Sequence, residues 1–375
     1  MNFDLSEEQQ MLRDALSRFV DDNYDLESRQ KNAAASGGFS KDHWGTMAEL
    51  GWFALPFDEA DGGFGGTQID NMVVMEQVGR GLVVEPFFAS VVLGGGVLKR
   101  AASTEQKAEL VPGIIDGTRQ LTLAYAEEQA RFDLHDVTTT GRKEGDGYVL
   151  NGQKSMVANA ETATQIIVSA RTGGGQIDES GISLFIVDAE AEGVTLTNFP
   201  TVDGGRASEI SFENVRVDAS ALIGAEGDGF GVLRNVANDA IVALCAEAVG
   251  AMETLYKDTV AYTQEREQFD HPLSDFQVLQ HRMVEMFMEY EQCKSLLFRA
   301  TMELASGDSV EAQRAVHAVK HMIGKAGTFI GENAVQLHGG MGMTEELRVG
   351  HYFKRLLVID AQFGNADYHL EQFAA

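Results

Sequence analysis

The sequence predicts an α+β multidomain chain in which a helical segment, a β segment and a second helical segment follow one another. Apolar residues recur every three or four positions near both ends of the chain, as on one face of a helix. Between them, short β-branched and aromatic runs alternate with Asp-Gly and Asn-Gly turns, which is typical of strands. A length of 375 residues exceeds what one core usually holds and predicts two or three domains. The change from helical to β to helical pattern predicts three, over residues 1–118, 119–222 and 223–375.

The amino-terminal segment opens with a helix predicted over residues 6–21. Ser6 is a favourable N-cap, acidic residues follow it, and one face of the helix is apolar. The glycine-rich run 61–66 follows no strand and matches no phosphate-binding spacing, so we interpret it as a connecting turn. Further helices are expected around Trp44 and at 68–80, 86–99 and 104–115.

The character of the chain changes near Gly117, where short β-type runs replace the helical pattern. After residues 227–230 the pattern returns to long helices, the first of them over 236–259. The strands expected between these points are 121–125, 137–140, 148–150, 164–170, 182–187, 194–196 and 209–212.

The stretch from Tyr262 to Tyr290 joins a charged loop to a long helix. Pro272 disfavours helical geometry in the residue before it, so Arg266 lies near a bend. A guanidinium at a bend is a candidate anion clamp, and a solvated surface charge is the alternative. The helix that follows carries an apolar stripe, which we expect to pack on a partner helix, at Phe276, Leu279, Met283, Met286, Tyr290, Cys293 and Leu297.

Composition excludes several classes of function. A net charge of −28 argues against nucleic acid and anionic membranes as partners, because both are polyanions. No apolar run is long enough to suggest a membrane span. The acidic, polar amino terminus lacks the basic start and apolar centre of a secretory signal, so we expect a cytoplasmic protein.

Cysteine and histidine usage gives no sign of a metal or disulfide framework. Cys245 and Cys293 each fall in a predicted helix and are interpreted as core residues. His317 and His321 lie four residues apart on a helix, but no third ligand is near them. We therefore predict no metal site.

Two motifs in the carboxy-terminal part carry a resemblance. The pattern R-x-Q-F-x-x-P-L-x-x-F-Q begins at Arg266, and the run Q-L-H-G-G-M-G-M-T-E-E begins at Gln336 after Gly-Glu-Asn-Ala-Val. The glycines of the second run allow a backbone to approach a ligand closely, although a helix C-cap is the commoner use of glycine. Together these motifs resemble the carboxy-terminal signature of the acyl-CoA dehydrogenase family, and the resemblance covers essentially the whole chain.

The resemblance implies a helical amino-terminal domain, a middle β domain, a carboxy-terminal four-helix bundle, FAD as cofactor and an acyl-CoA substrate. In this family FAD lies across a subunit interface, and the neighbouring chain's Arg and Gln-Gly-Gly motifs hold its ADP half. An electron-transfer flavoprotein-like acceptor is also implied. The residues that match the family's cofactor-binding positions are Arg266, Phe269, Gln277, Gln336, Gly339, Gly340 and Asn365.

The motifs that would face the chain's own flavin depart from the family pattern. Where the family has Thr/Ser-Glu-Pro-x-x-Gly-Ser-Asp, residues 126–133 keep Glu127 and Asp133 but lose the hydroxyls, the proline and the glycine. Asn-Gly-Gln-Lys at 151–154 is present, yet the Trp-x-Thr expected after it reads Met-Val-Ala from Met156.

The family's catalytic base is missing at both of its usual positions. One alignment puts Phe363 at the place of the Glu, and the other puts Ala240 there, with Ile241 replacing an Arg that anchors CoA. Asp239 and Glu247 are the remaining candidates. Glu247 lies about 10 Å along the helix from Ala240, since each residue rises roughly 1.5 Å; the alternatives are an exposed acid for Asp239 and a structural ion pair for Glu247.

Three hypotheses follow. In the first, this chain works with an unlike family member and lends its cofactor-binding residues to FAD bound mainly on that partner. In the second, it is a homomeric acyl-CoA dehydrogenase, dimer or tetramer, that uses Asp239 or Glu247 as base. In the third, it is a catalytically silent scaffold subunit.

Overall fold

The computed structural model describes residues 5–375. The prediction about a secretory signal rests partly on residues 1–4, which lie outside the described residues. The chain divides into two compact units, each described by itself below. The first comprises Met1–Lys31, Thr67–Val83 and Ile241–Ala375, and the second comprises Asn32–Gly66 and Val84–Ala240.

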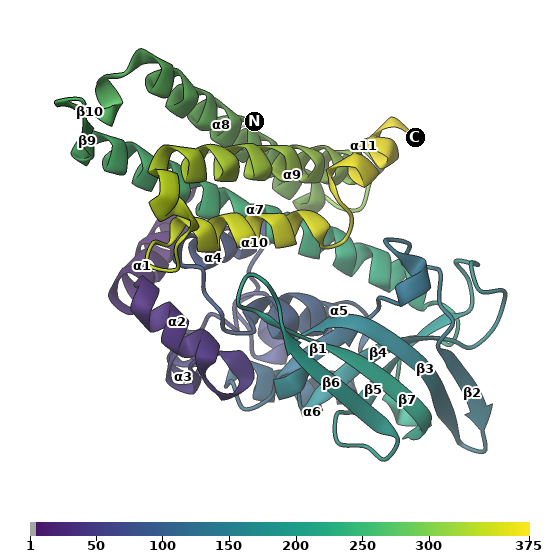
Figure 1. The fold of residues 1–375 in the computed structure, drawn as a ribbon. Helices are drawn as coiled ribbons and strands as arrows, with labels where there is room; N and C mark the ends of the chain where they lie inside the picture. The colour runs from purple at the N-terminus through teal and green to yellow at the C-terminus, as the bar shows by residue number, and fades with distance from the viewer. Residues whose placement is uncertain (1–4) are drawn as a thin grey trace. The chain divides into compact units, whose positions relative to one another are not determined.

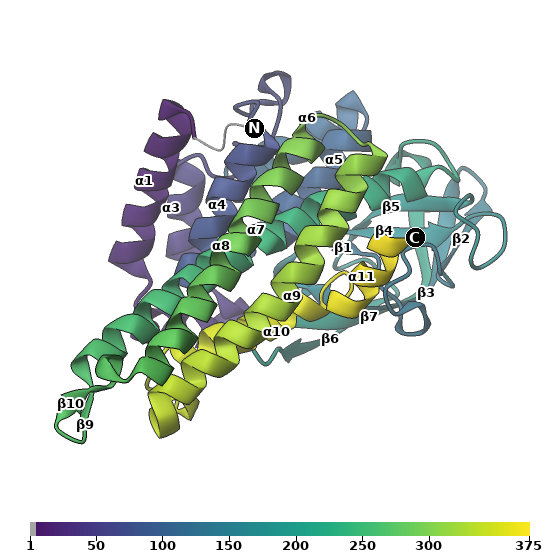
Figure 2. The same cartoon turned by 90° about the horizontal axis from the view of Figure 1, so that it is seen from above.

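The first unit is helical (Figures 1 and 2). Its amino-terminal helix α1 begins after Ser6, whose hydroxyl accepts from the Gln9 N–H in a capping box, as the sequence predicts. Helix α7 starts in the second unit and ends in the first, and α2 (Leu26–Ala34) also crosses the division. The elements of the first unit are α1 (Glu7–Asn23), α4 (Gln68–Gly81), α7 (Gly229–Glu265), β9 (Glu267–Gln268), β10 (His271–Pro272), α8 (Gln277–Ala305), α9 (Val310–His338), α10 (Val349–Ala361) and α11 (Ala366–Ala374).

The apolar stripe of α8 packs inside this unit, as predicted. Helix α8 lies along α9, and part of it also contacts α4. Phe276 and Leu279, at the start of the stripe, are only half-buried. Burying apolar side chains in this way is the main favourable contribution to helix stability in a folded protein. The fully buried members of the stripe are Met283, Met286, Tyr290, Cys293 and Leu297.

Helices α4 and α7 cross at two glycines. A Cβ built on Gly79 would lie 1.8 Å from the carbonyl oxygen of Glu247, and one built on Gly250 would lie 1.9 Å from that of Glu76. These distances are far below any allowed contact, so both positions require glycine. The crossing fixes the faces that α4 and α7 present to the rest of the unit.

The second unit contains the sheet and the helices that precede it in sequence. Within the described residues the sheet has eight strands in the order β6-β7-β3-β2-β4-β5-β8, with β1 pairing in parallel with β4. The strands are β1 (Leu121–Ala124), β2 (Thr140–Glu144), β3 (Gly147–Ala158), β4 (Gln165–Arg171), β5 (Ile182–Asp188), β6 (Val194–Pro200), β7 (Arg206–Asp218) and β8 (Leu222–Ile223). The helices are α3 (Lys41–Glu49), a π-helical segment η3 (Phe88–Gly95), α5 (Gly96–Ala101) and α6 (Thr104–Ile115).

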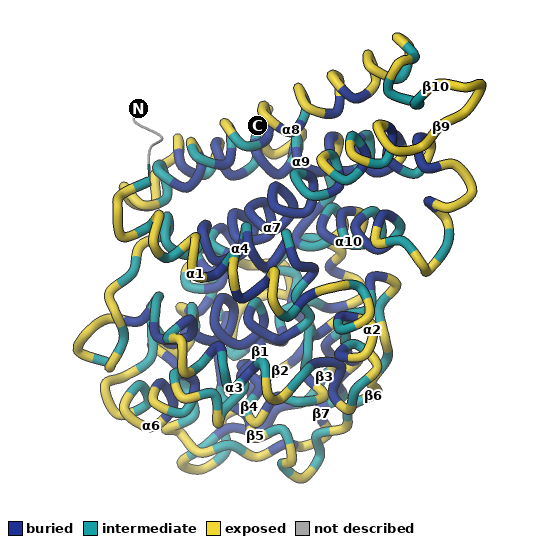
Figure 3. The backbone as a smooth tube through the Cα atoms, turned by 90° about the vertical axis from the view of Figure 1, so that its left-hand side faces the viewer, coloured by how far each residue is buried: buried dark blue, intermediate teal, exposed yellow. Residues whose placement is uncertain are grey.

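The sheet has its own buried core. Leu150, Val168, Phe185 and Phe212 contribute from four different strands and are at most 2% exposed. Most pairs are antiparallel, for example Ile166 with Val187 across β4 and β5. Figure 3 shows the interior strands largely buried. This core positions the loops that the family resemblance assigns to the flavin.

The structure confirms the predicted fold class of helical, β and helical parts in that order. One strand prediction is wrong in detail, because the run expected at 137–140 begins only at Thr140. The N–H groups of Thr138 and Thr139 instead donate to the Glu127 carboxylate at 2.8 and 3.1 Å. Cys245 and Cys293 are free and buried, as expected of core residues. No helix among residues 5–375 combines the length and apolar character needed to cross a membrane.

The α4–α7 crossing gives a direct test. Gly250→Ala is expected to lower the free energy of unfolding by about 2 kcal/mol or more, because the new methyl group overlaps the Glu76 carbonyl. Gly231→Ala is the matched control on the same helix, since no described atom lies within 4 Å of its Cβ position. The control is expected to be neutral or to stabilise by up to about 1 kcal/mol. Equal urea midpoints for the two variants would contradict the close crossing.

Candidate functional site

Arg266 follows directly on α7 at the base of a small hairpin. Its N–H donates to the Tyr262 carbonyl at 2.8 Å, and its own carbonyl accepts from the Leu273 N–H at 2.8 Å. The Arg266 side chain is exposed and forms no ion pair or hydrogen bond with any residue between 5 and 375. In a chain with a net charge of −28, a guanidinium with all its donors available is suited to bind an anion.

The hairpin gives Phe269 an unfavourable backbone conformation and an exposed side chain. Gln268 pairs with His271, so Phe269 and Asp270 form a two-residue turn, with φ values of 56° and 64°. Such turns favour Asn and Gly, and a bulky residue at positive φ costs roughly 1 kcal/mol or more. The Phe269 side chain is also 85% exposed, although its ring meets that of Phe276 edge-on at 6.4 Å. Neither burial nor backbone geometry within the chain accounts for a phenylalanine here, which indicates a contact outside it.

The second predicted loop follows α9. Gly339 has φ 61° and ψ −142°, a conformation that favours glycine, and no described atom lies within 4 Å of a Cβ built on Gly339 or Gly340. Both glycines and Gln336 are exposed. The His338 ring stacks on Tyr262 with centroids 4.2 Å apart, which connects this loop to the end of α7 that precedes Arg266.

The structure therefore brings six of the seven predicted cofactor residues to one end of the helices. Figures 1 and 2 both show the β9–β10 hairpin at the same end as the turn that follows α9. Gln277, at the start of α8, is exposed there too. These six residues combine a cation, an exposed aromatic ring and two glycines with open space above them. Such a set of groups is suited to contact a nucleotide.

Asn365 lies elsewhere. Its side-chain oxygen accepts from the Tyr368 N–H at 2.9 Å and caps α11. His321 bonds to the Ala366 carbonyl at 2.8 Å and precedes Gln336 by fifteen residues of α9, which places Asn365 about 22 Å along that helix from the glycine loop. A cofactor role for Asn365 stays a prediction, and within one chain it is separate from the other six residues.

Both candidate bases are engaged in ion pairs. The Glu247 carboxylate receives two hydrogen bonds from Arg355, with Nε 2.5 Å from Oε1 and Nη2 2.7 Å from Oε2, and its side chain is 4% exposed. Asp239 accepts from Nε and Nη2 of Arg100. At Glu247 the guanidinium bonds to both carboxylate oxygens, and at Asp239 both nitrogens bond to Oδ2. This favours the structural alternative for Glu247, and a role as base stays a prediction for either residue.

The position aligned with the usual catalytic Glu is rigidly held. Phe363 is buried with φ 58°, and its carbonyl accepts from the His369 ring at 3.1 Å. Lys320 is fully buried, and its Nζ donates to the carbonyls of Asp360 and Gly364 at 2.8 and 2.7 Å. Burial lowers the pKa of the Lys320 ammonium. Hydrogen bonds thus hold the backbone around Phe363 in place, but the phenylalanine side chain cannot accept a proton.

Glu127 and Lys154, which match the family pattern of the flavin-side motifs, form a buried ion pair. Lys154 Nζ lies 2.7 Å from Glu127 Oε1 and also donates to Ser169 Oγ at 2.9 Å. Both side chains are at most 2% exposed. Burial alone would raise the pKa of Glu127, but the charge of Lys154 and hydrogen bonds from Lys154 and Thr138 outweigh it and lower the pKa to about 2. The pair therefore stabilises the β domain.

Two residues beside this pair carry unusual backbone geometry. Arg131 has φ 51° and ψ −101° and stands where the family motif has glycine. Met156 has φ 53° and is 59% exposed, at the place of the motif's tryptophan. At Arg131 the backbone has a conformation that favours the glycine of the family motif. Sequence alone shows these replacements but not that Arg131 keeps a conformation favoured by glycine.

Comparison with known proteins supports the resemblance across the whole chain. Residues 6–118, 122–215 and 227–375 match the acyl-CoA dehydrogenase N-terminal, middle and C-terminal domains. The probable acyl-CoA dehydrogenase YngJ of Bacillus subtilis is 30% identical over 372 residues, which cover 98% of this chain and 97% of YngJ. The caffeyl-CoA reductase-Etf complex subunit CarC of Acetobacterium woodii is 27% identical, covering 93% and 92% of the two chains.

Solved structures show the same fold. The ChsE4-ChsE5 complex from Mycobacterium tuberculosis contains a chain that matches with a TM-score of 0.90 and 24% identity, covering 100% of this chain and 98% of that one. The class is that of flavoprotein oxidoreductases with FAD as cofactor. The chain belongs to the acyl-CoA dehydrogenase family.

The Glu127–Lys154 pair predicts a specific dependence of stability on pH. Glu127→Gln leaves a buried ammonium without its partner and is expected to lower the free energy of unfolding by about 3–5 kcal/mol at neutral pH. Because the folded pKa of Glu127 is lowered from 4.5 to about 2 and burial lowers the pKa of Lys154 to about 8, the contribution of the charged pair is fully present only between pH 4.5 and about 8, and it is lost as the pH falls toward 2. The difference between wild type and variant should shrink over that interval in chemical denaturation.

The exposed neighbour Glu128 provides the matched control. Glu128→Gln is expected to change the free energy of unfolding by no more than about 0.5 kcal/mol. A Glu127→Gln deficit that stays constant down to pH 2 would show that the carboxylate charge is not what stabilises the domain.

The conformation of Arg131 gives a second stability prediction. Arg131→Gly is expected to raise the free energy of unfolding by about 1 kcal/mol, because glycine adopts this backbone geometry without strain. Arg131→Ala keeps the Cβ atom and is expected to give no such gain. Identical thermal midpoints for the Gly and Ala variants would mean that Arg131 is unstrained.

Proposed function

We propose that this chain is one subunit of a heteromeric acyl-CoA dehydrogenase that carries out α,β-dehydrogenation of an acyl-CoA thioester. In this proposal it lends Arg266, Phe269, Gln277, Gln336, Gly339 and Gly340 to FAD bound mainly on an unlike partner of the same family. The observation that carries the proposal is the exposed β9–β10 hairpin, in which Arg266 has no partner among the described residues and Phe269 is strained and 85% exposed.

The residues present fit the nucleotide end of FAD. The Arg266 guanidinium would neutralise the diphosphate, and the exposed Phe269 ring would cover an aromatic base. Gly339 and Gly340 leave room for a backbone approach to phosphate oxygens. The bound flavin supplies the hydride acceptor that dehydrogenation needs.

The flavin and substrate ends of the chain's own site fit less well. Phe363 and Ala240 stand at the two positions where a base is expected, and neither removes protons. The two candidate carboxylates, Asp239 and Glu247, are paired with arginines. A base supplied by a second chain explains both observations together.

Two relatives show that family members work in assemblies with other proteins. CarC is a subunit of a complex with an electron-transfer flavoprotein, and ChsE4-ChsE5 is a complex of two named components. By analogy we propose a second family member as partner and an electron-transfer flavoprotein-like protein as electron acceptor.

Expression of the chain alone and with a candidate partner tests the proposal. Alone, the chain is expected to be colourless and inactive, and with the right partner the purified complex is expected to be yellow and to form enoyl-CoA. Yellow, active protein from the chain alone would favour the homomeric alternative with Asp239 or Glu247 as base. Absence of FAD and activity with every family member encoded nearby would favour the scaffold alternative.

Within the complex, Arg266→Ala is expected to lower FAD affinity by at least about tenfold, because a hydrogen-bonded charge is removed from the diphosphate. Arg299→Ala is the matched control. Like Arg266, Arg299 is exposed and has no side-chain partner among residues 5–375, but it lies on α8 away from the hairpin. FAD retention after dilution measures the effect. Equal retention by the two variants would refute the role of Arg266.

A further inference from the structure

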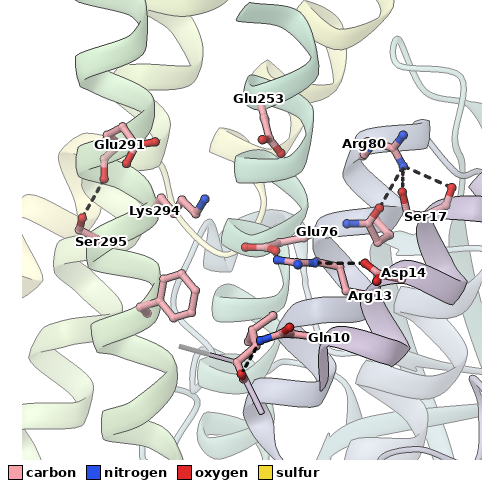
Figure 4. A pocket seen from close by; sticks show the side chains of 13 residues that line it. Gln10, Arg13, Asp14, Ser17, Glu76, Arg80, Glu253, Glu291, Lys294 and Ser295 are labelled. Atoms are coloured by element: carbon pink, nitrogen blue, oxygen red, sulfur yellow. Dashed lines mark hydrogen bonds and ion pairs between the residues drawn. The ribbon is translucent and has the colours of Figure 1, made fainter. Parts of the chain in front are cut away.

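A pocket of about 630 Å³ lies among α1, α4, α7 and α8 of the first unit, lined by none of the proposed nucleotide-binding residues. Its volume is within the range of about 300–1,000 Å³ that small-molecule sites occupy. The side chains that face it are mainly charged (Figure 4). Some of these charged groups form ion pairs or hydrogen bonds within the chain, and others do not.

Glu76 is the clearest unsatisfied group. Its Oε1 atom is buried without a hydrogen-bond partner, and the carboxyl forms no ion pair with any residue of the described chain. Leaving a buried polar group unpaired is costly, and most such groups in proteins have a partner. Burial raises the pKa of Glu76 to about 7, opposed by the charges of Lys294 and Arg13 and reinforced by Glu253.

Two cations facing the same space also have unused donors. Lys294 Nζ donates to the Tyr290 hydroxyl at 3.2 Å and lies 5.5 Å from that ring's centroid, which leaves N–H groups available. Arg13, at the exposed rim, forms one ion pair with the part of the chain that the structure describes, with Asp14 at 3.9 Å. Figure 4 shows the Arg13, Lys294, Glu76 and Glu253 side chains directed toward a common space.

Arg80 provides the contrast within the pocket. Its Nη1 donates to Ser17 and Gln77 and its Nη2 pairs with Asp21, so both terminal nitrogens are used, and the Ser17 and Asp21 bonds hold α1 on α4. Lys294 and Glu76 have opposite charges and line one pocket, yet they form no ion pair. An anion alone would meet Glu76 and Glu253, and a cation alone would meet Lys294 and Arg13.

We propose that this pocket binds a small zwitterion of the amino-acid class, with its ammonium on Glu76 and its carboxylate on Lys294 and Arg13. Glu253, whose Oε1 already accepts from Lys257 Nζ at 2.7 Å, lies beside the ammonium as a second negative charge. Such a ligand satisfies the unpaired donors and the unpaired acceptor together. The site is independent of FAD and of the subunit arrangement proposed above.

Binding by this arrangement depends on pH. Glu76 accepts from an ammonium group best as the carboxylate, so affinity increases as the pH rises through about 7. The charged groups that face Glu76 are Arg13 and Asp14 on α1, Arg80 on α4, Glu253 on α7, and Glu291 and Lys294 on α8.

Isothermal titration of the purified protein with glycine, β-alanine, γ-aminobutyrate and lysine tests the proposal, with acetate and methylammonium as single-charge probes. At least one amino acid is expected to bind about tenfold or more tightly than both single-charge probes, and tighter above pH 7 than below it. Glu76→Gln and Lys294→Met are each expected to reduce that affinity about tenfold. Glu285→Gln, an exposed change on α8 outside the pocket, is expected to leave it unchanged.

Three results would overturn the proposal. They are no measurable binding of any amino acid, equal binding of acetate or methylammonium, and unchanged affinity in both pocket variants. Because the experiment needs neither flavin nor turnover, its failure is distinguishable from failure of the proposed dehydrogenase function.

Discussion

The buried ion pair between Glu127 and Lys154 is the interaction on which the β domain's motif loops depend. It joins the segment after β1 to strand β3, and the same carboxylate holds the N–H groups of Thr138 and Thr139. Glu127 and Lys154 keep the family pattern and are buried and bonded within the chain, whereas Asp133 also keeps it and is exposed. Arg131 and Met156, which depart from the pattern, are exposed as well. The buried ion pair therefore keeps the family residues, while part of the exposed motif does not.

The helical unit shows the opposite distribution. There six of the seven predicted cofactor residues, all but Asn365, are exposed. The β9–β10 hairpin also keeps Phe269 at positive φ despite its cost. Strain and exposure at one residue are difficult to explain by stability alone, because Asn or Gly would suit this turn better. An exposed Phe269 in a backbone conformation that lowers stability is consistent with a hairpin that binds a molecule outside the chain. This distribution is the basis of our proposal that the chain contributes to another chain's cofactor more than to its own.

Much of this fold was predictable from the sequence, because its signals are local. The α8 stripe from Met283 to Leu297 and the Ser6 cap depend on residues within a few turns of one another. The Glu247–Arg355 pair joins residues 108 positions apart, and the unpaired Glu76 depends on the crossing of α4 with α7. The strand expected at Val137 is lost because Glu127 captures its neighbours' N–H groups. Such tertiary contacts leave no periodic signal, so neither the fate of the candidate bases nor the polar pocket was visible in the sequence.

The stoichiometry of FAD in the purified assembly tests the central claim most directly. Flavin absorbance measured against the amount of each chain, determined by amino-acid analysis, gives the number of FAD molecules per subunit. If this chain lends its nucleotide contacts but holds no flavin of its own, the assembly is expected to contain one FAD for each pair of unlike chains. One FAD for every chain, this one included, would contradict the account.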